Sequence, residues 1–217
     1  MIDGISIAVD DDAVIVVARE PLTAVSSAAV GGGFTRARAI VNMHVEKDFP
    51  LEDLDARLGA FARRRELPGP WIGLFTGAWT AQATLGEESA GDIRAIAVST
   101  AGLSNLVAAG ISAPARAAVG TINTIVVVDA VVDAAALVNT VMTVTEVKVA
   151  ALIASGRRCG DGASPTGTST DAVVVAATGR GRRCGFGGPV SDLGWVVARA
   201  ARASLETGIA QWPGART

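Results

Sequence analysis

The stretch that decides the fold is Gly120-Thr-Ile-Asn-Thr-Ile-Val-Val-Val-Asp-Ala130. Residues 122–128 form a nearly unbroken apolar run rich in β-branched side chains, which predicts a central strand covered on both faces. Asp133 stands where it can cap a helix, and we expect that helix to run from Ala134 to about Ala154. A buried strand that leads into a long apolar helix indicates a sheet with packed helices.

Strand and helix patterns continue toward the N-terminus. Short β-rich runs separated by Asp10-Asp11-Asp12 predict three strands in an antiparallel meander, at residues 5–9, 13–18 and 22–30. A short helix is expected from Thr35 to Val41 after three glycines, and a longer one over residues 50–65. Two further strands are expected at residues 71–76 and 93–99, followed by a long irregular segment over residues 100–121.

The C-terminal part predicts a loop at residues 159–170, strands at 171–177 and about 182–186, and a last helix. Ser191 or Asp192 is expected to cap this helix, which runs to about Thr207. The whole order predicts an α+β fold: a mixed, largely antiparallel sheet with packed helices, hairpins at both ends, and a single domain over residues 1–217.

Composition excludes several classes of protein. The net charge is −2 with acidic and basic residues nearly balanced, so there is no overall field to hold nucleic acid. Mean hydropathy is +0.41, yet Asn123, Asp129 and Asp133 interrupt the longest apolar tract, and we expect no membrane span. Two cysteines do not make a disulfide framework, and no signal peptide is visible, so the cytoplasm is expected. The sequence leaves a homo-oligomer open.

A hydrolytic zinc site usually needs three His, Asp, Glu or Cys ligands. The chain has one histidine, His44, and its cysteines, Cys159 and Cys184, lie far apart, so no zinc site is predicted. A magnesium site made of carboxylates alone has no motif behind it, and no metal site is assigned. A lone histidine is more often a surface or core residue than a catalyst, although histidine is the usual general base near neutral pH.

The long apolar helix carries a polar stripe. Asn139, Thr143 and Glu146 are spaced by four and three residues and share one face, while Thr145 and Lys148 lie on others. Because the helix is apolar almost all round, we expect it to be buried, and a buried carboxylate must be paired, hydrogen-bonded or protonated. The stripe is either a structural contact or the lining of a cleft.

Hydroxyl-rich loops offer a second set of candidates. Thr166-Gly-Thr-Ser-Thr-Asp171 has the small and polar residues that allow the backbone to approach a ligand, but it lacks the Gly-Lys-Ser/Thr ending of a phosphate-binding loop. Ser104 is not part of a Gly-x-Ser-x-Gly elbow and has no evident histidine partner, so a catalytic triad is not predicted. Gly31-Gly32-Gly33 followed by Arg36 is either a solvated turn or a ligand contact.

Several of these segments together resemble the adenosylcobinamide amidohydrolase family. The helical Thr143-Val-Thr-Glu-Val-Lys148 is similar to the family's Thr-x-Thr-Glu-x-Lys, and the loop at 166–172 to its Thr-Gly-Thr-Gly-Thr-Asp-Ala. The other similar segments are 120–130, 101–105, the Gly31–Asn42 region and 188–194. They run in order from about residue 25 to residue 200. Ser169 departs from the family's glycine, and would strain the loop if that position needs a positive φ.

The resemblance implies hydrolysis of the amide that joins the corrin ring's propionyl side chain to aminopropanol, within corrinoid salvage. The corrinoid is then the substrate and brings its own cobalt, so no separate cofactor is implied. Glu146 or Asp171 is the expected general base, and Glu146 is the favoured one because an aspartate between a loop and a strand often only fixes a turn. The expected substrate-binding residues are Gly32, Gly33, Arg36, Asn42, Ser104, Asn105, Thr121, Asn123, Asn139, Thr143, Thr166, Thr168 and Thr170.

Two alternatives remain at the level of sequence. The protein could be a non-catalytic corrinoid-binding or regulatory module, and the departure from the family's glycine at Ser169 is the sequence feature that favours this hypothesis. It could also be an unrelated amidase in which Ser104, Thr121 or Thr168 is the nucleophile.

Overall fold

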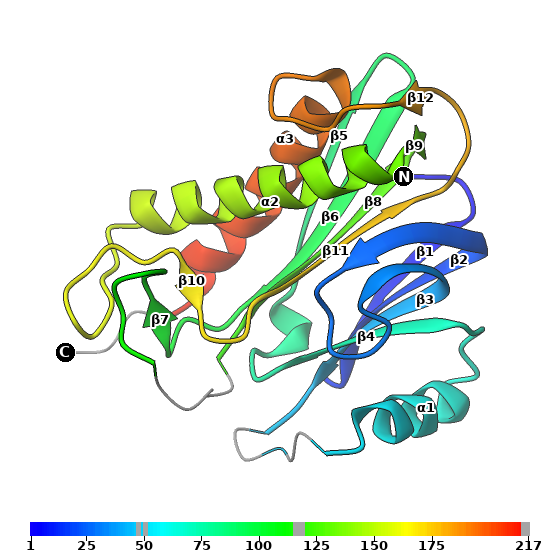
Figure 1. Ribbon diagram of the computed structural model, residues 1–217. Coiled ribbons are helices and arrows are strands. Elements are labelled where there is room, and N and C mark those ends of the chain that lie inside the picture. Colours follow the sequence, from blue (N-terminus) through cyan, green and yellow to red (C-terminus); the bar gives the residue numbers. More distant parts are fainter. Residues whose placement is uncertain (47–48, 50–51, 115–119, 214–217) are drawn as a thin grey trace.

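The computed structural model describes residues 1–46, 49, 52–114 and 120–213. Within them, three α-helices pack on one mixed, mostly antiparallel sheet, so the expected α+β class is confirmed (Figure 1). The helices are α1 (Leu54–Arg64), α2 (Ala134–Ala154) and α3 (Asp192–Gln211). The strands of the main sheet are β1 (Ile5–Val9), β2 (Ala13–Ser26), β3 (Gly33–His44), β4 (Trp71–Thr76), β5 (Thr84–Ala90), β6 (Ile93–Ala101), β8 (Ile122–Asp129) and β11 (Ala172–Ala177).

The strand order in the main sheet is β4-β3-β2-β11-β8-β6-β5, and β1 pairs with β2. Two short pairs lie outside it. The strand β7 (Leu106–Val107) pairs with β10 (Gly167–Thr168), and β9 (Val131–Val132) pairs with β12 (Arg183–Cys184). A short 3₁₀ turn, η1, covers Thr80–Gln82.

The sheet curls, so that β3 and β4 face β6 and β8 although β2 and β11 separate them in the strand order. The pairing of β2 with β3 shifts register between Val17 and Leu22, which is where the long strand bends. One buried apolar cluster then contains Ile72 of β4, Val98 of β6 and Ile125 of β8. The concave side of the sheet is therefore a core in its own right.

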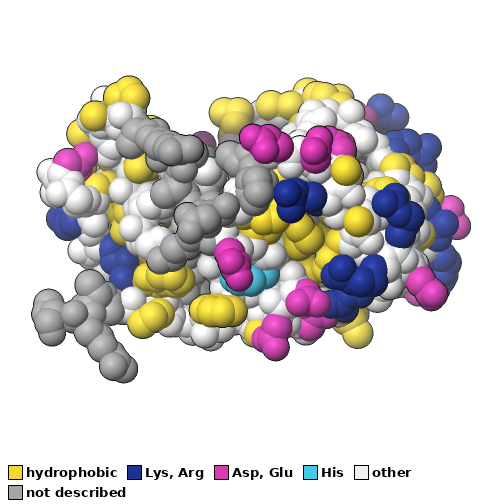
Figure 2. Space-filling view, turned by 90° about the horizontal axis from the view of Figure 1, so that it is seen from below, with side chains coloured by type: hydrophobic (Ala, Val, Ile, Leu, Met, Phe, Trp, Pro, Cys, Tyr) yellow, Lys and Arg dark blue, Asp and Glu magenta, His cyan; other side chains and the backbone are white. Residues whose placement is uncertain are grey.

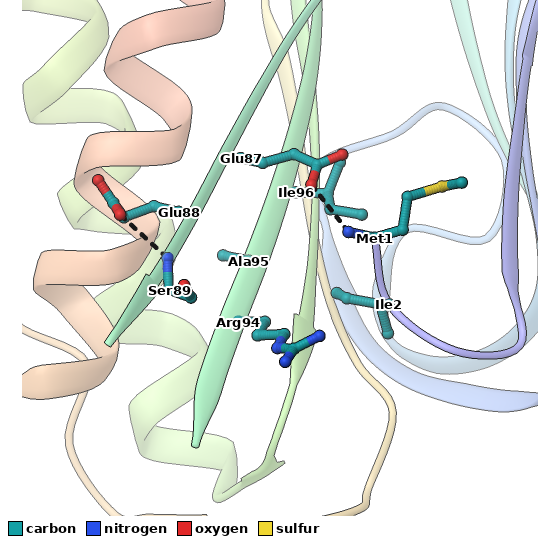
Figure 3. A pocket seen from close by; sticks show the side chains of 8 residues that line it. All are labelled: Met1, Ile2, Glu87, Glu88, Ser89, Arg94, Ala95 and Ile96. Atoms are coloured by element: carbon teal, nitrogen blue, oxygen red, sulfur yellow. Dashed lines mark hydrogen bonds and ion pairs between the residues drawn. The ribbon is translucent and has the colours of Figure 1, made fainter. Parts of the chain in front are cut away.

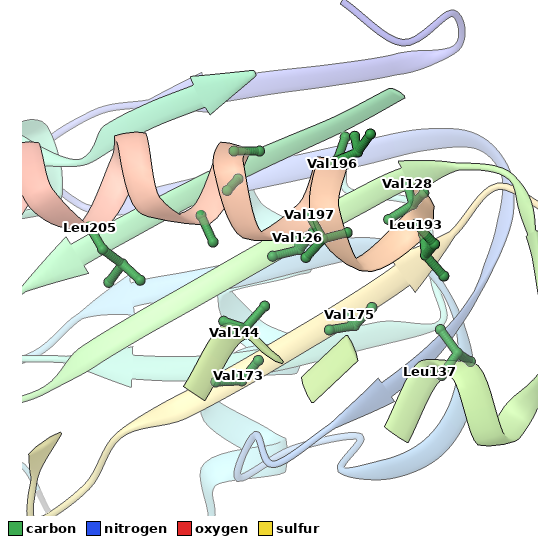
Figure 4. Close-up of a cluster of buried hydrophobic side chains, with 14 of the residues drawn as sticks. Val126, Val128, Leu137, Val144, Val173, Val175, Leu193, Val196, Val197 and Leu205 are labelled. Carbon is green, nitrogen blue, oxygen red and sulfur yellow. The ribbon is translucent and has the colours of Figure 1, made fainter. Parts of the chain in front are cut away.

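Helices cover the outer surfaces of the curled sheet. On one side α2 and α3 pack against β6, β8 and β11 through a cluster of small and branched side chains (Figure 4). Val126 and Val128 of β8 contribute to it, with Leu137 of α2 and Leu193 of α3. On the other side, Leu58 and Phe61 of α1 form a smaller cluster with β2 and β3.

The central strand is confirmed as the sequence predicted it. In β8, Ile125 and Val127 face the concave core while Val126 and Val128 face the helices, and all four are at most 2% exposed. Its parallel partner is β11 and its antiparallel partner is β6. Burial on both faces explains why the run shows no alternation of polar and apolar residues.

One helix prediction and two strand predictions were wrong. Residues 35–41 belong to β3 and are not helical. Residues 22–26 continue β2 after the register shift and do not form a separate strand, so the third strand of the meander is β3. The predicted C-terminal hairpin is absent from the described residues, because β11 pairs with β8 and β2 while β12 pairs with β9.

The three longer helices that the sequence predicted are present, with shifted ends. The helix expected over residues 50–65 begins at Leu54, and residues 50 and 51 lie outside the described residues. Ser191 caps α3, since its hydroxyl accepts a hydrogen bond from the Gly194 amide at 3.0 Å. Asp133 stands at the N-cap of α2 without such a bond and forms an ion pair with Arg183 at 2.8 Å instead.

The expectation that α2 is buried all round was wrong. Val138, Met142 and Ile153 are 43%, 55% and 53% exposed. By length and composition α2 could cross a membrane, but a packed core helix passes the same test. Its opposite face packs on α3 and β11, which is how a helix of a folded domain buries itself.

A glycine lets α3 lie directly on the edge strand β5. A Cβ at Gly86 would lie 2.1 Å from the Ala200 carbonyl oxygen and 2.9 Å from the Ser204 nitrogen, both backbone atoms of α3. Gly86→Ala is therefore expected to lower the free energy of unfolding by at least about 1–3 kcal/mol, the usual effect of overpacking. Gly160→Ala is the control, because a Cβ there meets nothing within 4 Å. Equal melting temperatures for the two variants would contradict the prediction.

Candidate active site

A buried ion pair joins two of the segments that sequence analysis singled out. The Lys148 ammonium, on the sheet side of α2, lies 2.5 Å from Oδ2 of Asp171 at the start of β11. Their side chains are only 10% and 11% exposed. Buried charges of opposite sign stabilise one another when their remaining polar atoms are also bonded.

Asp171 has partners on both of its carboxylate oxygens. Oδ1 accepts hydrogen bonds from the Thr168 hydroxyl and from the Ile122 amide, the latter at 3.0 Å. Oδ2 accepts from the Thr168 amide at 3.1 Å as well as from Lys148. Asp171 therefore ties the hydroxyl-rich loop to β8 and α2.

The loop that Asp171 holds presents several hydroxyl groups. Thr170 is exposed, and its hydroxyl donates to the Thr121 hydroxyl at 3.0 Å, which in turn donates to the Thr170 carbonyl at 2.7 Å. Thr166 accepts from the Ala109 amide at 2.9 Å and so supports the β7–β10 pair. Thr168 and Thr121 are buried, Thr166 is half-buried, and Thr170 is exposed.

A second polar group closes the curled sheet at the same end. The Asn123 amide nitrogen donates to Asn42 Oδ1 at 2.8 Å and to the Phe75 carbonyl at 3.0 Å, and its oxygen accepts from the Ala172 amide at 3.2 Å. Asn42 donates in turn to the Thr100 hydroxyl at 2.9 Å. We call Asn42, Thr100 and Asn123 the amide cluster. They come from β3, β6 and β8 and are each at most 2% exposed.

The structure thus brings together Asn42, Thr121, Asn123, Thr168, Thr170 and Asp171 at one end of the sheet. Ala172 follows Asp171 directly and pairs with Asn123, so the ion pair and the amide cluster are adjacent. Asn42 and Asn123 are buried and bonded to each other, so they are suited to support a site. Thr170 is exposed, so it is suited to contact a ligand.

Asn105 joins the same end from the preceding loop, and its amide donates to the Ser169 hydroxyl at 2.7 Å. Ser104 is exposed one residue earlier. Ser169 is not among the residues with positive φ, so serine brings no left-handed strain at this position. The backbone strain that a serine at position 169 could have caused in this loop is therefore absent.

The glycine segment and Arg36 lie elsewhere on β3. Arg36 is exposed, and its guanidinium donates to the Pro21 carbonyl at 3.4 Å beside the bend of β2. It lines a cavity of about 350 Å³ there, together with Arg19 and Arg180. Gly32 and Gly33 are exposed at the start of β3, while Asn42 and His44 lie at its other end. The structure does not join Gly32, Gly33 or Arg36 to the amide cluster.

The polar stripe on α2 differs from its prediction. Thr143 is buried and donates to the Gly187 carbonyl at 3.1 Å, and Asn139 is half-buried. Glu146 is exposed, whereas Lys148 is the buried charge. The expectation of a buried Glu146 was wrong, and the signal for the correct residue was a lone lysine within an apolar helix.

Glu146→Gln is a direct test of what exposure implies. Water solvates the Glu146 carboxylate, so the argument that burial makes it a strong base no longer holds. We expect this variant to melt within a few degrees of the parent, because exposed substitutions usually change stability by less than about 0.5 kcal/mol. We also expect it to keep most of its turnover, since burial no longer supports a general-base role for Glu146. Loss of most turnover without loss of stability would return the general-base role to Glu146.

Other groups contribute less to the site. The thiols of Cys159 and Cys184 are free and buried, and burial raises the pKa of each, which makes them poor nucleophiles. Among the described residues, no group of three or more His, Cys, Asp or Glu side chains could hold a metal ion. A cavity of about 210 Å³ lies near the N-terminus, where the terminal ammonium pairs with Glu87, and it shares no residue with the amide cluster (Figure 3).

The face of the molecule that Figure 2 shows has no large patch of side chains that all carry the same charge. Acidic and basic side chains are interspersed there, with apolar side chains between them. This agrees with the nearly balanced composition.

The structure therefore gathers hydroxyls, amides and a buried ion pair at one end of a curled α+β sheet. The chain belongs to the adenosylcobinamide amidohydrolase family, whose model matches residues 1–217. The family name identifies it as an amidohydrolase of corrinoid salvage.

Other comparisons add little. The search of curated proteins found no match. Among solved structures, the chain is similar to the PH0078 protein from Pyrococcus horikoshii OT3, with 13% identity, 96% of this chain and 79% of that chain covered, and a TM-score of 0.47. A likeness this low supports no inference about function.

Proposed function

We propose that the protein hydrolyses the amide between the corrin propionyl side chain and aminopropanol in adenosylcobinamide, giving adenosylcobyric acid and 1-amino-2-propanol. The observation that carries this proposal is the family match over the whole chain. The cobalt belongs to the corrinoid substrate, and the proposal includes no separate cofactor. A cytoplasmic location fits this role.

The site supports an amide substrate through its polar groups. Thr170 and Ser169 are exposed on a loop that Asp171 and Lys148 hold in place, and Asn105 reaches the same loop. Hydroxyl and amide groups can donate to the substrate carbonyl and accept from its N–H. We assign Asp171 and Lys148 a positioning role, because every carboxylate oxygen of Asp171 already accepts hydrogen bonds.

The reaction requires one water molecule for each amide. The oxygen of water attacks the amide carbonyl carbon, and its proton passes to a base. The tetrahedral intermediate then expels nitrogen, which takes a proton as the C–N bond breaks. A carboxylic acid and an amine are the products. Donors aimed at the developing oxyanion would contribute most to the rate.

The test is incubation of the purified protein with adenosylcobinamide, followed by separation of the corrinoids and detection of 1-amino-2-propanol. We expect both products in equal amounts. No product over a range of pH and metal supply would overturn the activity. Binding without turnover, seen as a change in the corrinoid's visible spectrum, would indicate a binding or regulatory module. A trapped acyl adduct on Ser104, Thr121 or Thr168 would indicate a hydroxyl nucleophile.

A further inference from the structure

The single histidine of the chain is held in one defined state. Nδ1 of His44 lies 2.9 Å from the Ala78 carbonyl oxygen. A carbonyl oxygen only accepts hydrogen bonds, so Nδ1 must carry the proton. In the neutral ring the lone pair is then on Nε2, which is the state a general base requires.

The ring is also fixed in orientation. It stacks on Trp79 with centroids 4.8 Å apart and planes at 17°. His44 is half-buried, while Trp79 is 59% exposed. A hydrogen bond at one edge of the ring and an indole stacked on its face leave the ring little freedom. The exposed indole beside it offers an apolar surface to a large flat ligand.

Strand geometry places His44 on the same side of β3 as the amide cluster. Met43 packs into the cluster under α1, and side chains alternate along a strand, so His44 points to the concave side, as Asn42 does. In the parallel pairing His44 lies opposite Thr76 of β4. Phe75, the residue before Thr76, accepts the hydrogen bond from Asn123. His44 therefore stands at the outer edge of the amide cluster.

We propose that His44 is the general base and acid of the amide hydrolysis, an inference that rests on the proposed function. Nε2 takes a proton from water as its oxygen attacks the substrate carbonyl carbon, and the carbonyl electron pair moves to oxygen. The imidazolium then gives that proton to the amide nitrogen as the C–N bond breaks. Water supplies the atoms gained by the products, and His44 returns to its starting state.

The test compares three proteins in the same adenosylcobinamide assay. His44→Ala is expected to lose turnover by about 10²–10⁴-fold with little change in KM, and added imidazole is expected to restore part of it. His44→Asn is the matched variant: its amide nitrogen is attached to Cγ, as Nδ1 of histidine is, so it can still donate to the Ala78 carbonyl but cannot carry the proton. It should stay as inactive as His44→Ala and keep the parental melting temperature.

The outcomes separate this inference from the proposed function. Absence of turnover in the parent would overturn the proposed function. Parental turnover in His44→Asn, or no rescue of His44→Ala by imidazole, would overturn the role of His44 alone. Nitrogen-15 NMR adds a readout that needs no activity, since one histidine gives one pair of ring signals. We expect a protonated Nδ1 in the neutral ring, and a protonated Nε2 with a bare Nδ1 would overturn the inference.

Discussion

Replacing Lys148 with methionine is expected to lower the free energy of unfolding by about 3–5 kcal/mol, the usual effect of removing one partner from a buried ion pair. The Asp171 carboxylate would remain 11% exposed with no cation beside it. Its bonds from Thr168 and Ile122 would persist but would not neutralise the charge. Methionine fills a volume similar to that of the lysine stem, so little of the loss should come from a cavity. Urea denaturation measures the change.

Two controls identify the cause of this loss. Arg202 pairs with Glu206 on the surface of α3, with side chains 61% and 47% exposed, and Arg202→Met should cost less than about 1 kcal/mol. The double variant Lys148→Met/Asp171→Asn should be more stable than the sum of the two single losses predicts. Additive losses would show that the pair does not act as a unit, and a loss below about 1 kcal/mol in Lys148→Met would contradict the prediction.

The parts of the fold that sequence predicted well have strong local signals. The apolar run of β8 indicated a central strand because both of its faces must be covered, and that is where the strand lies. The capping position of Ser191 likewise marks the start of α3.

The strand predictions failed where tertiary contacts decide the structure. In β3, Ala37 and Ala39 are fully buried while Arg36 and Arg38 are not, which is the period of a strand, and over residues 40–42 both faces are buried. The three glycines before this segment led to the expectation of a helix start. Edge strand β5 was missed because its sequence, Thr84-Leu-Gly-Glu-Glu-Ser-Ala90, has few β-branched residues, and it is held by contact with α3.

The site was predictable as a set of segments but not as a set of contacts. Helical spacing shows which residues of α2 share a face, but it does not show which face meets the sheet. This is why Glu146 was expected to be buried and Lys148 was passed over. The contact of Asn42 with Asn123 depends on the curl of the whole sheet, and no local pattern encodes it.

Replacing Asn123 with leucine is expected to cause the other large loss, because three hydrogen bonds to buried groups depend on this side chain. Asn42 Oδ1, the Phe75 carbonyl and the Ala172 amide would each lose a partner. An unsatisfied buried group costs about 1–3 kcal/mol, so the variant should lose at least about 3 kcal/mol of unfolding free energy. Turnover should fall with it, since the cluster joins β3, which carries His44, to β8 and β11, which carry the loop.

A matched control lies one residue along the same strand, on its opposite face. Ser99 and Thr124 are both 1% exposed, and their hydroxyls lie 3.2 Å apart between β6 and β8. The variant Ser99→Ala/Thr124→Val removes both hydroxyls at once, which leaves no group of that pair without a partner and should be nearly neutral. Urea denaturation of both variants measures the contrast. If Asn123→Leu is as stable as this control, the amide cluster does not hold the two halves of the curled sheet together.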